Sequence, residues 1–222
     1  MALRGIGRGE PRFSSPLFEK ASDSTEENRA LARLITGTRS RAATEPVGLV
    51  QACRQGDREA FRALYEVYKD DVYSIAWHFT GDEEAARDVT QDVFLKLFSA
   101  IGGFRGESSF RTWLFRLVAN ACRDAQRRTW RLVAAEVVLE SAQDRGSPDV
   151  DAREREISRR VRSAVVSLAP KVRLAILLRY VEDLSYSEIA TALGCSPGTV
   201  ASRLNRGHRM LAKRLHALRG TV

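Results

Sequence analysis

Apolar residues recur at steps of three and four along three long segments of the chain, which is the period of α-helices with one buried face. In the first segment they are Phe61, Leu64, Tyr65, Tyr68, Val72, Ile75, Ala76 and Phe79. Thr80-Gly81-Asp82 ends that helix and starts the second, whose inner positions are Ala86, Val89, Val93, Leu97 and Ile101. After a glycine-rich break at 102–106, a third helix begins at Ser108 or Ser109 and turns inward Phe110, Trp113, Leu114, Leu117, Val118, Ala121 and Ala125. No segment alternates convincingly like a strand, so the sequence predicts an all-α fold.

Two helix starts lie close together near the C-terminus, with a glycine between them. Ser185 and Glu188 have the spacing of a capping box, and Gly194 is suited to end the helix that they start. Ser196 is suited to be the N-cap of the next helix, with Pro197 at its first position. Two short helices around a glycine-containing turn form a helix-turn-helix, whose second helix lies in the major groove of DNA.

The second helix of this motif separates its apolar residues from its polar ones. Val200, Leu204, Gly207 and Leu211 share one face. The opposite side and its flanks hold groups that pair with base edges and phosphates: Thr199, Ser202, Arg203, Asn205, Arg206, Arg209 and Lys213. A solvated basic helix that closes an ordinary bundle is the alternative interpretation. The two cap signatures at this spacing favour DNA binding.

The helical patterns divide the chain into an extension, two modules and a linker. Residues 1–45 are rich in Gly, Ser, Thr, Arg and Glu without a sustained apolar period, which predicts a mostly disordered N-terminal extension. The first module covers 46–131 and the second 157–222, and the segment 132–156 between them contains the turn-forming residues 146–149. We therefore expect two small helical domains joined by a flexible linker, the C-terminal one a helix-turn-helix.

The net charge of +8 suits a polyanionic partner. Charge alone does not distinguish nucleic acid from an anionic membrane surface as that partner. No apolar run approaches the roughly 18 residues of a membrane span, so no membrane insertion is expected. The three cysteines, Cys53, Cys122 and Cys195, are widely spaced, which favours a reducing cytoplasm over a disulfide framework.

Three sequence features bear on enzymatic or metal chemistry, and none favours it. The chain lacks the Walker, H-E-x-x-H and G-x-S-x-G motifs, so we expect no enzyme, no cofactor and no small-molecule substrate. Zinc binding is a weak alternative because no C-x-x-C or H-x-x-x-H pair occurs. Its candidate ligands are the cysteines with His78, His208 or His216.

The first module carries three surfaces that each have a functional and a structural interpretation. One helix carries a cluster of acidic residues, Asp82, Glu83, Glu84, Asp88 and Asp92. This cluster is either a docking surface for a basic helix of a partner or a solvent-exposed face without a partner. The loop at 102–107 is either a wedge for an unstacked base or a plain connection between helices. The next helix carries arginines between tryptophans, a combination that suits single-stranded nucleic acid. Trp113 on that helix is equally suited to the core.

Four stretches together resemble the extracytoplasmic-function (ECF) subfamily of sigma-70 type RNA polymerase sigma factors. Residues 57–61, 86–95 and 104–114, with Asn120, are similar to domain two of that family. Residues 185–215 are similar to domain four. With Leu184 before them, they carry its Leu-Ser-Tyr-Ser-Glu-Ile-Ala and Leu-Gly-Cys-Ser-Pro-Gly-Thr-Val pattern. The resemblance covers residues 47–131 and 155–217, with the two modules in the family's order.

The resemblance implies a non-enzymatic factor that binds core RNA polymerase, recognises the −35 and −10 promoter elements and promotes DNA melting. The matching positions for the clamp helices of the polymerase are Asp88, Gln91 and Asp92. Domain four would also touch the flap, and an anti-sigma factor is a further implied partner. The melted −10 strand would meet Phe104, Arg105, Arg111, Trp113, Asn120, Arg127 and Arg128. The −35 duplex would meet the helix from Pro197. A stand-alone helix-turn-helix regulator is the alternative, and it explains the second module only.

Overall fold

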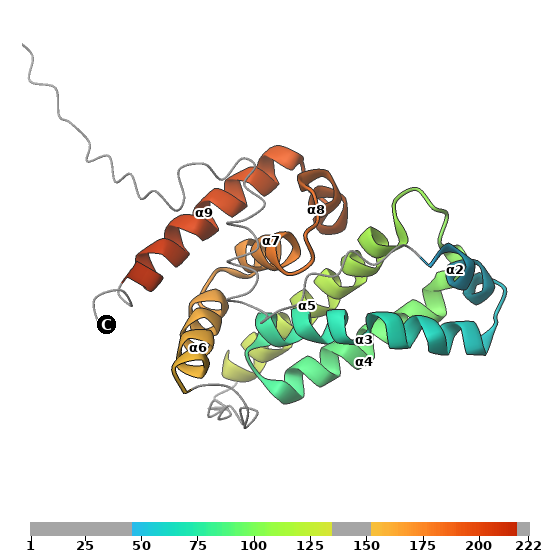
Figure 1. Ribbon diagram of the computed structural model, residues 1–222, viewed down its shortest axis with the longest axis horizontal. Helices are drawn as coiled ribbons and strands as arrows, with labels where there is room; N and C mark the ends of the chain where they lie inside the picture. Colours follow the sequence, from blue (N-terminus) through green and yellow to red (C-terminus); the bar gives the residue numbers. More distant parts are fainter. Residues whose placement is uncertain (1–45, 135–151, 217–222) are drawn as a thin grey trace, which may run out of the picture.

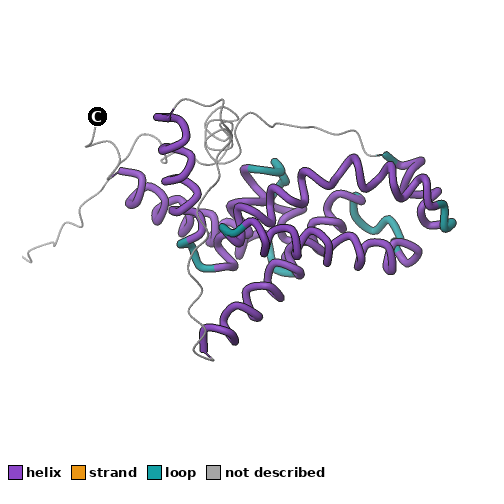
Figure 2. Tube along the Cα trace, turned by 90° about the horizontal axis from the view of Figure 1, so that it is seen from below, coloured by secondary structure: helices purple, strands orange, loops and turns teal. Residues whose placement is uncertain are grey.

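The computed structural model describes residues 46–134 and 152–216, and within these ranges it contains α-helices and one 3₁₀ turn but no strand (Figure 2). The all-α prediction is therefore confirmed. The predicted extension at 1–45 lies outside the described residues, as do residues 135–151 of the predicted linker.

Two helical domains follow one another along the chain (Figure 1). The first contains α2 (Val47–Arg54), α3 (Arg58–Thr80), α4 (Glu83–Ala100), the 3₁₀ turn η1 (Ile101–Gly103) and α5 (Phe110–Ala134). The second contains α6 (Ala152–Val166), α7 (Pro170–Tyr180), α8 (Tyr186–Leu193) and α9 (Pro197–His216). Helices α5 and α6 thus extend into both ends of the segment 132–156 that the sequence assigns to a linker.

The helix boundaries lie where the sequence places its capping residues. Gly81 ends α3 in the left-handed conformation with φ of 74°, and the Asp82 side chain accepts a hydrogen bond from the backbone N–H of Ala85 at 2.8 Å. The capping box of Ser185 and Glu188 is present at the start of α8. Both boundaries are as predicted, because short polar side chains and a left-handed glycine satisfy the helix ends locally.

The helix-turn-helix is also confirmed. Gly194 ends α8 in the left-handed conformation with φ of 63°. Ser196 accepts the backbone N–H of Thr199 at 3.2 Å, as an N-cap of α9 does.

The core of the first domain lies where α3, α4 and α5 meet. It contains Leu64, Val72, Val89, Leu97 and Leu114, all with no exposed surface. These residues belong to the three predicted inner stripes, so the helical period was assigned in the correct phase. Tyr65 is an exception, because the sequence places it in the stripe of α3 but its side chain is 38% exposed.

Helix α7 is buried on almost every side. The seven consecutive residues from Val172 to Leu178 are all buried, and Arg173 among them is only 7% exposed. A helix that is apolar all round belongs in the interior of a larger structure. Helix α7 reaches this position because α8 and α9 pack on one side of it and α3 and α5 of the first domain pack on the other.

Helix α5 has a second buried stripe that the sequence does not predict. Phe115, Ala119 and Cys122 have no exposed surface, although they lie outside the stripe assigned to the core. They are spaced at four and three residues and share a face with Arg111. This face meets the second domain, because α5 packs against α7 and α8. The two domains therefore bury one continuous apolar core between them.

Gly207 allows α9 to approach α7 closely. A Cβ atom at this position would lie 2.7 Å from Cγ1 of Ile176 and 3.2 Å from Cγ1 of Val172. We expect Gly207→Ala to destabilise the protein by about 1–3 kcal/mol through overpacking, offset in part by about 1 kcal/mol of helix preference.

Gly198→Ala is the matched control on the same helix, because the nearest atom to its added Cβ is Oγ of Ser196 at 3.9 Å. It should leave the free energy of unfolding unchanged or slightly higher. Urea denaturation followed by circular dichroism compares the two variants, and equal stabilities would contradict the close approach.

Candidate polymerase and nucleic-acid interfaces

The polar side of α9 faces solvent as the sequence predicts. Ser202, Asn205, Arg206, Arg209 and Lys213 are exposed, while Val200, Leu204, Gly207 and Leu211 are buried. Thr199 and Arg203 are half-buried at the flank. A guanidinium N–H of Arg203 donates to Sγ of Cys195 at 3.4 Å, so the loop before α9 holds this side chain. The exposed set forms a continuous row of donors and acceptors along one helix face.

A buried polar pair fixes α9 on α7. The hydroxyl of Tyr180 and Nε2 of His208 are hydrogen-bonded, and the two side chains are 8% and 5% exposed. Burial lowers the pKa of His208. The sequence assigns no role to His208 beyond the zinc alternative. Within the described residues, no group of three or more His, Cys, Asp or Glu side chains could hold a metal ion.

The loop after η1 separates its two candidate residues. Phe104 is half-buried, with its ring centroid 5.7 Å from that of Phe110 and 5.2 Å from that of Trp113. Arg105 is exposed beside it. Phe104 and Trp113 therefore contribute to an aromatic cluster that still has accessible ring surface.

The arginines of α5 point to different surroundings. Arg127 and Arg128 are exposed, and so is Asn120, whose Oδ1 accepts from Arg123 at 2.9 Å. Arg111 instead contacts the second domain, where it donates to Oε2 of Glu182 at 2.8 Å. Among the predicted strand-binding residues, Arg111 is thus bound to an acceptor in the second domain.

The predicted docking residues lie on the outer side of α4. Asp88 and Gln91 are exposed, and Asp92 is half-buried. Asp92 accepts from Arg128 of α5 at 3.2 Å. One residue predicted to meet the polymerase and one predicted to meet DNA therefore form an ion pair with each other.

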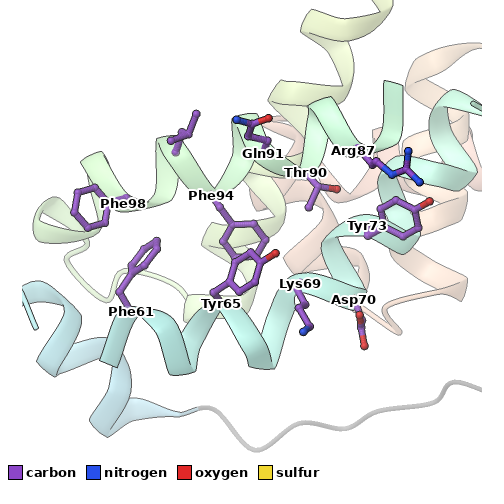
Figure 3. A pocket seen from close by; sticks show the side chains of 11 residues that line it. Phe61, Tyr65, Lys69, Asp70, Tyr73, Arg87, Thr90, Gln91, Phe94 and Phe98 are labelled. Atoms are coloured by element: carbon purple, nitrogen blue, oxygen red, sulfur yellow. The ribbon is translucent and has the colours of Figure 1, made fainter. Parts of the chain in front are cut away.

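An apolar groove between α3 and α4 was missed in the sequence (Figure 3). Phe61, Tyr65, Phe94, Leu95 and Phe98 provide most of its aromatic and aliphatic surface. Leu95 and Phe98 are 61% and 58% exposed, and Gln91 is at the edge. A signal was available, because Leu95 and Phe98 are large apolar residues outside the inner stripe of α4.

Comparison with protein families identifies both domains. The model of sigma-70 region 2 matches residues 64–132, and that of sigma-70 region 4 matches residues 158–211. Both models come from sigma-70 type factors, the class of protein that directs RNA polymerase to promoters.

Comparison with curated relatives identifies the subfamily of sigma factors. The chain is 34% identical over 180 residues to the RNA polymerase sigma-H factor of Pseudomonas aeruginosa, with 77% of this chain and 93% of the relative covered. It is 32% identical over 182 residues to the ECF RNA polymerase sigma-E factor of Haemophilus influenzae, with 77% and 95% covered. The chain belongs to the ECF subfamily of RNA polymerase sigma factors. Its function is accordingly that of a promoter-recognition factor, as the resemblance implies.

Solved structures share the fold. CnrH in complex with the cytosolic domain of CnrY matches with a TM-score of 0.59 at 26% identity, over 78% of this chain and 99% of CnrH. The sigma factor RpoE of Bartonella quintana, in complex with the anti-sigma factor NepR, matches with a TM-score of 0.60 at 24% identity, over 70% and 96%. In the part of this chain that the structure describes, no helix is long and apolar enough to cross a membrane.

His208 predicts a pH dependence of stability. Because burial lowers its pKa, the folded chain binds a proton less readily than the unfolded chain, whose histidine pKa is about 6.5. This contribution to the free energy of unfolding is present above about pH 6.5 and is lost progressively as the pH falls below that value. We expect the loss to be smaller in His208→Gln.

Urea denaturation of both proteins at several pH values between 5 and 8 measures this difference. Titrating groups that the two proteins share cancel in the comparison. Parallel stability curves would contradict a role of His208.

Proposed function

We propose that the two domains divide the work of promoter recognition among three surfaces. The groove of α3 and α4, with the acidic side of α4, binds core RNA polymerase. The loop after η1 and the exposed side of α5 bind the melted −10 strand, and the polar side of α9 reads the −35 duplex. The first of these domains covers 46–131, the second 157–222, and the linker 132–156. The factor acts in the cytoplasm, without catalysis or a cofactor of its own.

The exposed row of polar side chains on α9 is the observation that carries the proposal. These side chains lie on a helix whose opposite face is anchored in the core, so they are held at fixed positions as base readout requires. The net charge of +8 adds long-range attraction to DNA.

The polymerase surface combines an apolar groove with carboxylates at its edge. Leu95 and Phe98 offer large accessible side chains, and Asp88 lies on the same outer side of α4. An amphipathic helix with basic flanks fits such a surface, because apolar anchors fill the groove and charges pair around it. We infer that the clamp helices of the polymerase bind here, at Asp88, Gln91 and Asp92 and in the groove.

Melted DNA meets a mixed surface on the first domain. Arg105, Asn120, Arg127 and Arg128 supply accessible hydrogen-bond donors and charge, and Phe104 with Trp113 supplies partial ring faces. Base stacking on an aromatic side chain contributes about 1–3 kcal/mol per base. Stacking of that size offsets the few kcal/mol that unstacking a base costs.

An anti-sigma factor is a further proposed partner. CnrH, at 26% identity, has been solved in complex with the cytosolic domain of CnrY. The similarity extends over both domains of this chain, which supports regulation by a protein partner of the same kind.

The groove predicts a polymerase-binding defect that can be measured. Leu95→Ser with Phe98→Ser should weaken binding to core polymerase at least tenfold, because buried apolar anchors dominate such interfaces. Asp88→Lys with Asp92→Lys should weaken it as well by charge repulsion. Co-purification with core polymerase and run-off transcription by the reconstituted holoenzyme measure both effects.

Val47→Ser is the matched control for the apolar change, because Val47 is 70% exposed on α2 and outside the groove. It should bind and transcribe normally. Unchanged co-purification of both double variants would refute the docking assignment.

The recognition helix predicts two distinct kinds of variant. Arg206→Ala should relax discrimination at one or two −35 positions, by about 1–3 kcal/mol for a lost bidentate base contact. Lys213→Ala, further along α9, should weaken binding to all sequences alike and reduce the salt slope by about one unit.

Selection from a randomised −35 library by the holoenzyme distinguishes the two variants. The alternative for Arg206 is a phosphate contact, since such contacts make up half or more of protein–DNA hydrogen bonds. Unchanged base preferences in Arg206→Ala would establish that alternative.

A further inference from the structure

The groove between α3 and α4 concentrates the exposed apolar surface of the first domain. In the described parts of the chain five large apolar side chains are exposed, and three of them, Tyr65, Leu95 and Phe98, line this groove. Aromatic contacts form its floor: the rings of Phe61 and Phe98 meet edge to face at 5.0 Å, and those of Tyr65 and Phe94 at 4.6 Å (Figure 3). The volume of about 570 Å³ leaves room for several side chains of a binding partner.

The rim of the groove favours a cationic partner. The two basic residues that line it, Lys69 and Arg87, each form an ion pair with a glutamate of their own helix. Asp70 also lines the groove, and Asp88 is exposed one helical turn before Gln91 at its edge. Because the paired charges cancel, Asp70 and Asp88 leave the rim with negative charge.

The sequence of the N-terminal extension contains one segment with the pattern of a short amphipathic helix. Ser24 and Glu27 have the spacing of a capping box, and Gly37 is suited to end the helix that they start. Between these ends, three large apolar residues at steps of three and four share one face: Leu31, Leu34 and Ile35. A helix this short is marginal in water on its own, so it gains stability only where another surface covers its apolar face.

The charge of this part of the extension is opposite to that of the rim. From residue 28 to residue 41 the sequence contains four arginines and no acidic residue. They are Arg29, Arg33, Arg39 and Arg41. Opposite charges of this kind attract the segment to the acidic side of α4 over a longer range than the apolar contact does.

The extension is joined to the described structure beside this groove. Helix α2, which starts at Val47, packs on α3 and η1, and it lies next to the start of α3 at the Phe61 end of the groove (Figure 3). Residues 37–45 span up to about 30 Å when extended. Helix α4, with 18 residues, is about 27 Å long. The connection is therefore long enough for residues 24–36 to reach any part of the groove.

We propose that residues 24–36 bind in the groove of α3 and α4 as an intramolecular helix. Its apolar face, Leu31, Leu34 and Ile35, covers Leu95 and Phe98. The occupied groove is closed to the clamp helices, so the extension lowers the affinity of the free factor for core polymerase. The docking rests on the groove and on the sequence of the extension, whereas the competition also rests on the proposed binding of polymerase in the groove.

The covalent connection makes weak docking sufficient. A short flexible linker gives a tethered segment an effective concentration of about 1 mM. A segment with a Kd on the order of 100 μM would then occupy the groove about ten times as often as it leaves the groove empty. Because the clamp helices bind only the empty groove, the apparent Kd for polymerase rises about tenfold.

A labelled peptide of residues 24–37 tests the docking on full-length proteins. Fluorescence anisotropy compares its binding to the wild type and to Leu31→Ser with Leu34→Ser, whose own segment no longer fills the groove. We expect the double variant to bind the peptide about tenfold more tightly than the wild type. Leu17→Ser with Phe18→Ser is the matched control, because it removes two apolar side chains of the extension outside the segment. It should bind the peptide as the wild type does.

Substitutions in the groove locate the peptide. Leu95→Ser and Phe98→Ser, added to the variant with Leu31→Ser and Leu34→Ser, should abolish peptide binding, and circular dichroism checks that the helices are retained. Peptide binding that survives these substitutions would overturn the docking, as would equal peptide affinities of the wild type and the first double variant. Light scattering tests a second copy as the occupant: a dimer of the wild type that Leu31→Ser with Leu34→Ser does not form would overturn the intramolecular arrangement.

Binding to core polymerase tests the competition separately. We expect Leu31→Ser with Leu34→Ser to bind core polymerase about tenfold more tightly than the wild type, and the control to be unchanged. If the peptide docks but polymerase binding is unchanged, the competition and the assignment of the groove to polymerase are both overturned, and the docking stands. If Leu95→Ser with Phe98→Ser weakens polymerase binding but no variant binds the peptide, the proposed function stands and the docking is overturned.

Discussion

The packing of α7 between the two domains determines the arrangement of everything around it. Its run from Val172 to Leu178 is buried on both sides, so α9 and α8 are placed by one face and α3 and α5 by the other. Burial of apolar surface contributes about 25 cal/mol per Å², and α7 contributes such surface to two domains at once. The position of the recognition helix relative to the acidic helix α4 follows from this element together with the direct packing of α8 on α5 and of α6 on α3.

Local rules account for the parts of the fold that the sequence predicts well. Helix ends at Gly81, Ser185 and Gly194 depend on a side chain or a backbone angle within a few residues, so the boundaries follow from the sequence alone. The second buried stripe of α5 could not be predicted in the same way. Phe115, Ala119 and Cys122 are apolar, but the partner that buries them lies beyond residue 151, and periodicity within α5 carries no information about it.

The candidate sites show the same limit of prediction from local sequence. The polar face of α9 was predictable, because the helix itself separates Val200 and Leu204 from Asn205 and Arg206. Arg111 lies among arginines and tryptophans on α5, which is the pattern expected of a strand-binding residue. Its hydrogen-bond acceptor, however, is Glu182, which is remote in sequence. The groove at Leu95 and Phe98 needs two helices to form, and only the residues off the inner stripe of α4 hint at it. Surfaces formed by a single helix could thus be predicted from the sequence, whereas surfaces formed by two helices could not.

The ion pair of Asp92 with Arg128 makes the proposed polymerase face of α4 and the proposed DNA face of α5 electrostatically dependent on each other. Its side chains are 36% and 52% exposed, so its net contribution to stability is small, about 0.2–1 kcal/mol. A ligand of either face that takes one member leaves the other with an uncompensated charge. Binding of a cation at Asp92 therefore makes the Arg128 side of α5 more positive, and a phosphate at Arg128 makes the α4 side more negative. The first domain thus has the charge pattern for its two ligands to favour each other's binding.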